Sequence, residues 1–351
     1  MEYEYIIVGA GSAGCVLANR LTEDGRHRVL LIEAGPKNNA LSLKIPAAVL
    51  KNLKSTKYNW AYQGEPEPEL GGRVITHDRG KTLGGSSSIN GLCFIRGHAL
   101  DFEGWRQSGC EGWGYADVLP YFKRLENYSG GESEYRGGDG PLVVHRPKPQ
   151  NPLYKAFIEA GRDAGYQTTD DICGYRQEGF GVFDMSTENG ERNSTAKAYL
   201  DPARRRQNLT VMTDKQVQKI FFNGNEATGI SYKTVNGDII KVDALKEVIL
   251  SAGAVGSPQL LMLSGVGPAS HLKDHGITIV ADMPGVGQNL NDHPDFVLKY
   301  KCLKPVSIWP QTRLVRRTFA GIRWLLRRDG ICASNQFEAV ACVRSAAGVQ
   351  Y

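Results

Sequence analysis

The chain has 351 residues, of which 41% are hydrophobic and 23% are charged, with 41 glycines and a formal net charge of +5. This composition is typical of a globular protein with one or two domains. It excludes a disordered chain, a coiled coil and a small disulfide-stabilised protein. The net charge is too small for this length to indicate a nucleic-acid-binding protein.

The cysteines and the N-terminus indicate a cellular compartment. Seven cysteines are widely spaced and include no C-x-x-C pair, so we expect free thiols in a reducing compartment. The first residues lack the basic region of a signal peptide. No apolar run reaches the roughly 20 residues of a membrane span. We therefore expect a cytoplasmic protein.

The first 35 residues predict a βαβ unit of the Rossmann type. Tyr3–Val8 is a short apolar run that ends at Gly9, and it predicts a buried strand. Ser12–Glu23 carries Ala, Val and Leu at helical spacing, and Val29–Glu33 repeats the strand pattern. The order is therefore strand, glycine turn, helix, strand.

The next pattern changes come after the βαβ unit. Arg79–Gly97 is dense in Gly and Ser and predicts a loop. Between Leu209 and Leu250, alternating segments are separated by Asn223-Gly224 and Asn236-Gly237, which predicts an antiparallel meander. The other predicted elements are helices at Ala116–Tyr128, Pro152–Ala164 and Ser257–Leu263 and strands at Lys246–Ser251 and Ala339–Val343.

The turn after the first strand carries a nucleotide-binding pattern. Gly9-Ala10-Gly11-Ser12-Ala13-Gly14 fits G-x-G-x-x-G, and its glycines permit a tight turn, backbone approach to a pyrophosphate, and close helix–strand packing. Glu33 lies 19 residues past Gly14 at the end of the second strand, where it can accept hydrogen bonds from a ribose. The alternative is a glycine turn without a ligand. The motif by itself does not separate NAD from FAD.

A second glycine- and serine-rich segment runs from Gly80 to Asn90. Its backbone amides can cradle a phosphate or approach a flat ring system. The alternative is a flexible surface loop. Ile89 and the apolar run Leu92–Ile95 argue against that alternative, because the segment leads into residues that we expect to be buried.

Three segments resemble motifs of the glucose–methanol–choline (GMC) flavin oxidoreductases. Gly80–Glu103 resembles their first signature, Gly253–Gly267 their second, and Pro284–Pro294 a further family motif. The resemblance implies an α/β fold in which an FAD-binding, doubly wound parallel sheet is joined by an antiparallel β-meander and an incomplete α+β substrate domain. It assigns residues 1–150 with 197–300 to the FAD-binding domain, and residues 151–196 with 301–351 to the substrate domain.

Within the family, the likeness is greatest to the choline dehydrogenase branch. The segments that carry it are Tyr58–Tyr62, Gly137–Pro141, Gln177–Gly181 and Ala333–Ala339. The implied cofactor is FAD, bound non-covalently, because Ile89 stands where members with a histidine-linked flavin carry that histidine. The implied cofactor-binding residues are Gly9, Gly11, Ser12, Ala13, Gly14, Glu33, Ala34, Thr82, Gly85, Ser86, Asn90, Gly91, Leu92, Cys93 and Val217.

The implied reaction oxidises a primary alcohol, choline or a similar compound, to the aldehyde by hydride transfer to flavin N5. Glu338 resembles a glutamate that faces the trimethylammonium group of choline in relatives, although Gln336 stands where those relatives usually carry His. The alternative for Glu338 is a solvated strand residue. The electron acceptor, whether a quinone, a respiratory chain or oxygen, stays open.

The catalytic base stays unassigned. The resemblance implies that the base is a histidine in a motif that lies beyond position 351. None of the seven histidines in this sequence matches that motif. We interpret His293 as structural or flavin-proximal. We therefore expect a C-terminally truncated chain. The competing hypotheses are a catalytically incomplete flavin-binding fragment and, disfavoured by the absent cysteine pair, an NAD-dependent or disulfide reductase.

Two further patterns have open interpretations. Six arginines interleave with apolar residues over Arg313–Arg328, which predicts a basic amphipathic helix. It can dock on a membrane surface or a partner, or it can be a solvated helix over the core. His271 and His275 are four residues apart, which suits a metal ion or, as we expect, a solvated helix end.

Overall fold

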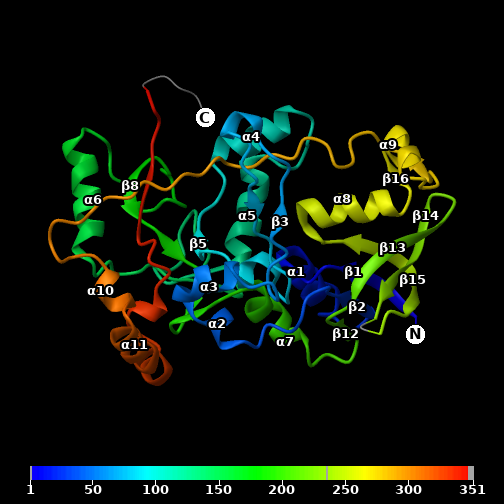
Figure 1. Ribbon diagram of the computed structural model, residues 1–351, viewed down its shortest axis with the longest axis horizontal. Helices are drawn as coiled ribbons and strands as arrows, with labels where there is room; N and C mark the ends of the chain where they lie inside the picture. The colour runs from blue at the N-terminus through cyan, green and yellow to red at the C-terminus, as the bar shows by residue number, and fades with distance from the viewer. Residues whose placement is uncertain (1, 235, 347–351) are drawn as a thin grey trace. The chain divides into compact units, whose positions relative to one another are not determined.

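The structure, a computed structural model, describes residues 2–234 and 236–346 (Figure 1). The chain forms two compact units. Unit 1 comprises Met1–Ala40, Lys51–Ile89 and Ser194–Leu298, and unit 2 comprises Leu41–Leu50, Asn90–Asn193 and Lys299–Tyr351. Residues 90–150 therefore fold with unit 2. The division into FAD-binding and substrate domains concerns function and stays a prediction.

Unit 1 is built on a six-stranded sheet with the order β12-β2-β1-β15-β14-β13. The strands are β1 (Tyr3–Val8), β2 (Val29–Ile32), β12 (Leu209–Met212), β13 (Gln216–Asn223), β14 (Glu226–Lys233) and β15 (Ile239–Leu250). β12, β2, β1 and β15 pair in parallel, while β13, β14 and β15 pair antiparallel. The predicted parallel sheet with an antiparallel meander is confirmed.

β15 belongs to both parts of this sheet. Its first residues pair with β14, with Ile239 opposite Lys233, and its last residues pair with β1, with Leu250 opposite Val8. A single strand of 12 residues thus carries the meander directly into the parallel sheet. The strand predicted at Lys246–Ser251 is the second half of β15. β12 was predicted within the meander, but it lies at the opposite edge of the sheet beside β2.

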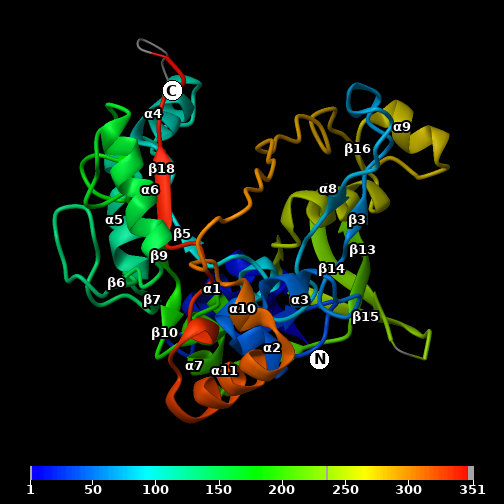
Figure 2. The same ribbon diagram turned by 60° about the vertical axis from the view of Figure 1, so that its left-hand side comes forward.

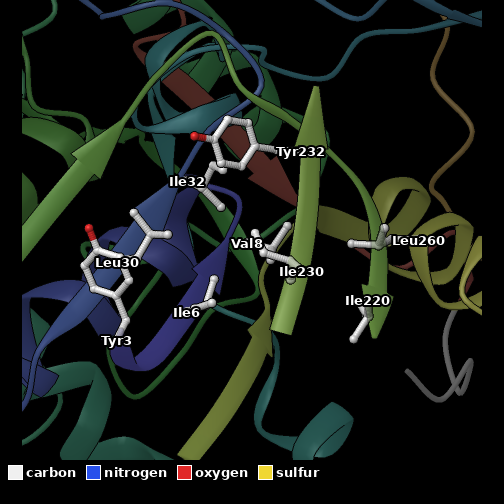
Figure 3. Close-up of a cluster of buried hydrophobic side chains, with 9 residues drawn as sticks. All are labelled: Tyr3, Ile6, Val8, Leu30, Ile32, Ile220, Ile230, Tyr232 and Leu260. Carbon is white, nitrogen blue, oxygen red and sulfur yellow. The ribbon is translucent and has the colours of Figure 1, made fainter. Parts of the chain in front are cut away.

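The core of unit 1 lies against the sheet (Figure 3). Ile6 on β1, Leu30 on β2 and Ile230 on β14 are fully buried, and Leu260 of the helix α8 (Gly253–Leu263) packs into the same cluster. Each such side chain contributes about 1.5–3 kcal/mol when it leaves water. The cluster therefore fixes α8 and the ends of the parallel strands relative to one another.

The remaining elements of unit 1 are mostly short. They are α1 (Ser12–Leu21), β3 (Tyr62–Gln63), η2 (Pro68–Leu70), β4 (Thr76–His77), η3 (Gly85–Ser88), η4 (Ala196–Leu200), α7 (Asp201–Ala203), β16 (Val266–Gly267), α9 (Ala269–Asp274) and β17 (Ala281–Asp282). The predicted βαβ unit β1–α1–β2 is confirmed. α8 begins four residues before its predicted start at Ser257, because the Gly253–Gly256 segment joins the helix.

Unit 2 combines helices with short strand pairs. Its elements are α2 (Leu41–Lys44), η1 (Pro46–Ala48), β5 (Cys93–Phe94), α4 (Ala99–Gln107), α5 (Tyr115–Leu125), β6 (Glu126–Tyr128), β7 (Leu142–Val144), α6 (Pro152–Asp163), β8 (Gly179–Val182), β9 (Asp184–Met185), β10 (Thr187–Glu188), β11 (Glu191–Arg192), α10 (Trp309–Thr312), α11 (Leu314–Arg327), η5 (Ile331–Ala333) and β18 (Ala339–Cys342). α3 (Val49–Leu53) spans a boundary between the units. Figure 2 shows β18, in red, beside α6. β18 pairs antiparallel with β8.

A buried ionic network terminates the predicted helix at Ala116–Tyr128 early. The helix ends at Leu125, and Glu126 begins β6. Both Glu126 carboxylate oxygens accept hydrogen bonds from Arg136, and Arg136 also pairs with Asp171 and Asp184. The helical spacing of apolar residues gives no sign of this contact, which moves Glu126 out of the helix.

Among the described residues, no helix has the length and apolar character to cross a membrane.

Candidate functional site

The turn between β1 and α1 contains three glycines, and the fold alone requires a glycine at two of these positions. Gly9 has a φ of +98°, and a Cβ there would lie 2.5 Å from the Ser251 carbonyl oxygen. A Cβ on Gly14 would lie 1.9 Å from the Gly9 carbonyl oxygen. Any side chain at either position would displace backbone atoms, so both glycines are required for the turn and for the packing of α1.

Gly11 is different, because the fold does not require a glycine there. Its φ of −74° and ψ of −162° are open to any residue. The nearest atom to an added Cβ is the Ser251 carbonyl oxygen at 3.8 Å, which is ordinary contact. Gly11 lines a cavity. The absence of a side chain therefore leaves space in that cavity for a ligand to approach the backbone.

Glu33 follows β2 at the same end of the sheet. Its carboxylate is buried, with Oε2 accepting a hydrogen bond from the Ala10 amide and Oε1 accepting one from the Gly35 amide, both at 2.8 Å. Burial raises the pKa of Glu33 to about 7, although the two amides partly oppose that effect. Each oxygen retains a lone pair for a ligand hydroxyl.

The second glycine-rich segment packs directly on the first. The Gly84 amide donates to the Ala10 carbonyl at 2.7 Å. Gly85 has a φ of +53°, and a Cβ there would lie 2.7 Å from Gly11 Cα. The hydroxyl of Ser87 lies 2.9 Å from that of Thr195. These contacts exclude a flexible surface loop and bring two motifs that are 70 residues apart to one place.

A cavity of about 560 Å³ in unit 1 opens where these segments meet. It lies at the ends of β1, β2 and β15, beside the first turns of α1 and α8. Of the sequence-predicted site residues, its lining includes Gly9, Gly11, Ser12, Ala13, Glu33, Ala34, Gly85, Ser86 and Val217. Gly14 packs α1 behind the turn. Thr82 is buried and donates its hydroxyl to the Pro36 carbonyl at 2.7 Å, so neither residue belongs to the lining.

Several lining residues were absent from the predicted set. Trp60 and Tyr62 stack with their rings 5.7 Å apart and nearly parallel, and the ammonium group of Lys81 lies 4.4 Å above the Trp60 ring. Both aromatic residues lie in the segment that resembles the choline dehydrogenase branch, so a signal for them existed. Lys215 follows β12 outside any motif, and sequence reasoning had no signal for it.

The predicted residues Asn90–Cys93 belong to unit 2, where they form a tightly held loop. The side-chain oxygen of Asn90 accepts from the Leu92 amide, and Leu92 has a φ of +62°. The Asn335 amide donates to the Gly91 carbonyl at 2.7 Å. The structure thus joins this loop to the Ser334–Glu338 segment within one unit.

Glu338 is buried rather than solvated, with 8% of its surface exposed. Its carboxylate accepts a hydrogen bond from the Ser334 hydroxyl. The pKa of Tyr154 is raised to about 12, first by burial and then by the nearby charge of Glu338. In the described part of the chain, no lysine or arginine forms a salt bridge with this carboxylate. Glu338 is therefore a buried carboxylate without a basic partner among the described residues.

Within the part of the chain that the structure describes, the histidine pair has no further metal ligand nearby. His271 and His275 lie at the end of α9 with their rings 4.7 Å apart in an edge-to-face arrangement. Over residues 2–234 and 236–346, no group of three or more His, Cys, Asp or Glu side chains is placed to hold a metal ion.

Residues 3–295 match the family model described as GMC oxidoreductase. The chain belongs to the GMC oxidoreductase family. This GMC chain is 48% identical over its full length to an oxygen-dependent choline dehydrogenase of Brucella ovis. It is 50% identical over 98% of its length to a protein of the same name from Ectopseudomonas mendocina. A formate oxidase variant from Aspergillus oryzae superposes with a TM-score of 0.90 at 28% identity, covering 98% of this chain and 62% of that one.

The GMC chain spans 64% of the length of the Brucella relative and 62% of the Ectopseudomonas relative. The family model and the superposed oxidase confirm the predicted family and the predicted fold class.

Proposed function

We propose that the cavity of unit 1 binds the ADP part of FAD. The observation that carries this proposal is Gly11, a glycine that only a ligand explains, at the N-terminus of α1 where the backbone amides and the helix dipole favour a pyrophosphate. Glu33 would accept hydrogen bonds from the ribose, and the backbone near Val217 would contact the adenine. The size of the cavity and the cationic groups of Arg79 and Lys215 in its lining fit a dinucleotide.

The second part of the proposal is that the protein oxidises a primary alcohol to its aldehyde. When bound, the flavin supplies the hydride acceptor for that oxidation. Within unit 2, Glu338 would attract a substrate that carries a fixed positive charge, such as choline, because an ionised carboxylate attracts a cation strongly away from water. The backbone of Asn90–Cys93 would hold the cofactor. The names of the curated relatives support this assignment.

An absorption experiment tests both parts. The purified chain is saturated with FAD, freed of unbound FAD by desalting, and mixed anaerobically with choline. A retained flavin that bleaches supports binding and oxidation. A retained flavin that stays oxidised with choline and with other primary alcohols contradicts the oxidation and favours the alternative, a flavin-binding chain without turnover.

Glu338→Gln provides the test of the substrate class. The variant keeps the side-chain volume and removes the charge, so we expect choline to reduce the flavin at least 10-fold less efficiently at low concentration, while a neutral alcohol of similar size is affected little. An equal effect on both alcohols would contradict the assignment of Glu338 to the cationic group.

We also propose that α11 contacts an anionic membrane surface. Its apolar residues Leu314, Phe319 and Leu326 are 67–79% exposed, whereas Trp324 on the other side of the helix is fully buried. Four arginines lie within α11, and Arg313 and Arg328 flank it; the helix contains no acidic residue. An exposed apolar face with a basic border fits lipid head groups of negative charge.

Vesicle sedimentation tests this contact. We expect the chain to sediment with vesicles that contain anionic phospholipid and to stay in solution with purely zwitterionic vesicles. Leu326→Glu should abolish the sedimentation, whereas Leu153→Glu, at an exposed leucine of α6, should leave it unchanged. Equal loss in both variants, or no sedimentation of the parent, would contradict the proposal.

A further inference from the structure

The hairpin of β3 and β4 supplies one wall of the unit 1 cavity. Tyr62 lies opposite His77 in this hairpin, and the Trp60 amide donates to the Arg79 carbonyl at 2.9 Å. Trp60, Tyr62 and Arg79 all line the cavity. Both strands of the hairpin therefore reach the cavity within one unit.

A buried asparagine holds the base of this hairpin. Asn59 is 3% exposed, and its Nδ2 donates to the Leu53 carbonyl and to Asp78 Oδ1, both at 2.6 Å. Its Oδ1 accepts from the amides of Ala61 and Arg79, both at 3.0 Å. The donor and the acceptor side of the amide are both satisfied, so its orientation is fixed. The Asn59 side chain therefore links the two strands of the hairpin to each other and to the preceding segment.

The residue between the two aromatic side chains has a strained backbone. Ala61 has a φ of +47°, in the left-handed region that a residue with a Cβ rarely adopts. The hydrogen bond from its amide to Asn59 Oδ1 holds it there. Such strain persists only where the surrounding structure fixes it, and it occurs most often at functional sites. Here the strained turn lies directly between Trp60 and Tyr62, which both line the cavity.

The two aromatic rings form a fixed flat surface. Trp60 and Tyr62 stack with their ring centroids 5.7 Å apart and nearly parallel, and the ammonium group of Lys81 lies 4.4 Å from the centroid of the Trp60 ring. The pKa of Tyr62 is raised, first by burial and then by the charge of Glu33. The phenol is thus within electrostatic reach of the carboxylate that would bind the ribose. A flat ring of a ligand stacks well on such a surface, because the side chains are already ordered.

We infer that Asn59 is a positioning residue that holds Trp60 and Tyr62 as a preformed aromatic wall, on which the adenine ring of the cofactor stacks. The inference rests on the proposed binding of FAD and adds two binding residues to it. Asn59 acts through the two rings and need not touch the ligand. The wall therefore contributes affinity for a ligand that carries a base and none for inorganic pyrophosphate.

Tyr62→Leu tests the wall itself. The variant keeps an apolar side chain and removes the ring, so we expect the affinity for FAD and for ADP to fall about 10-fold. The affinity for inorganic pyrophosphate should not change. Trp60→Leu is the second variant if Tyr62→Leu does not fold. Tyr58→Leu is the matched control, because Tyr58 belongs to the same segment but does not line the cavity.

Asn59→Asp tests the positioning role. The substituted carboxylate keeps the two accepted hydrogen bonds but sets an oxygen against the Asp78 carboxylate, so the base of the hairpin should loosen and ADP affinity should fall about 10-fold. Adding Asp78→Asn returns a donor to this pair and should restore part of the affinity. Asp78→Ala, which removes only one of the four hydrogen bonds of Asn59, replaces Asn59→Asp if that variant does not fold, and it should lower ADP affinity to a smaller extent.

A combination of substitutions shows whether Asn59 acts through the rings. In a chain that carries both Trp60→Leu and Tyr62→Leu, Asn59→Asp should add little further loss of ADP affinity, because the rings that it positions are gone. A contribution of Asn59 to the fold alone would lower the affinity by the same factor in the presence and in the absence of the rings.

Calorimetric titration with FAD, ADP and inorganic pyrophosphate, on variants that melting curves show to be folded, gives the decision. Weaker binding of FAD and ADP with parent-like binding of pyrophosphate supports the inference. Parent-like ADP affinity in Tyr62→Leu, equal losses for ADP and pyrophosphate, or additive effects of Asn59→Asp and the two aromatic substitutions overturn it. A parent that binds no FAD overturns the proposed function itself, which is a different result.

Discussion

Replacing Gly11 and Gly14 one at a time separates ligand binding from folding within one motif. A Cβ at position 11 has only the Ser251 carbonyl oxygen nearby, at 3.8 Å, and the backbone there is extended. Gly11→Ala should fold with unchanged or slightly higher stability, since alanine restricts the unfolded chain by about 0.4–1 kcal/mol. A Cβ at position 14 would lie 1.9 Å from the Gly9 carbonyl oxygen, far inside the 3.4 Å of ordinary contact.

The two variants therefore fail in different ways. The added methyl group of Gly11→Ala projects into the cavity and keeps a pyrophosphate from the backbone amides. The loss of one hydrogen bond to a charged group amounts to about 1.5–3 kcal/mol, or roughly a 10- to 100-fold weaker Kd for FAD. Gly14→Ala must push α1 away from the turn, which costs about 1–3 kcal/mol or more of folding stability.

Urea unfolding and FAD titration of both variants measure these effects. The expected pattern is a stable Gly11→Ala protein with weak binding and a destabilised Gly14→Ala protein. A Gly11→Ala protein that binds FAD as tightly as the parent would show that the cofactor does not fill the space at Gly11.

Two further predictions concern buried charges. Burial raises the pKa of Glu33 from 4.5 to about 7, so in the cofactor-free chain the contribution of Glu33 to stability is fully present below about pH 4.5 and is lost as the pH rises through about 7. Relative to Glu33→Gln, the parent's free energy of unfolding should fall by about 3 kcal/mol over that range, as measured by urea unfolding against pH; parallel pH curves would contradict this. Arg136→Met leaves the buried Glu126 and Asp184 without their shared cation and should cost about 3–5 kcal/mol. The exposed Arg106→Met should cost less than about 1 kcal/mol, and similar urea midpoints for both variants would disprove a structural role for the network.

Local patterns predicted much of the fold. The strand Tyr3–Val8 and the hairpin at Asn223-Gly224 follow from apolar periodicity and turn chemistry, which act over a few residues. The early end of α5 could not be predicted, because Glu126 leaves the helix to meet Arg136 ten residues later. The edge position of β12 depends on pairing with β2, a contact across about 180 residues. Such contacts leave no periodic trace in the sequence.

The candidate site was predictable where a motif fixes the backbone. Gly9 and Glu33 have the geometry that the glycine pattern implies. Thr82 belongs to a motif, but its hydroxyl donates to the Pro36 carbonyl and the residue does not line the cavity. A residue within a motif therefore does not always line the site. Lys215 enters the lining only because β12 ends beside β2. A side chain brought in by long-range pairing has no local signal.

The most direct measurement is the amount of FAD that the purified chain retains after saturation and desalting, with NAD as the parallel ligand. We expect one FAD per chain, no retained NAD, and loss of the flavin in Gly11→Ala. A folded chain that retains no FAD, or that retains NAD instead, would contradict the assignment of the cavity to a flavin cofactor.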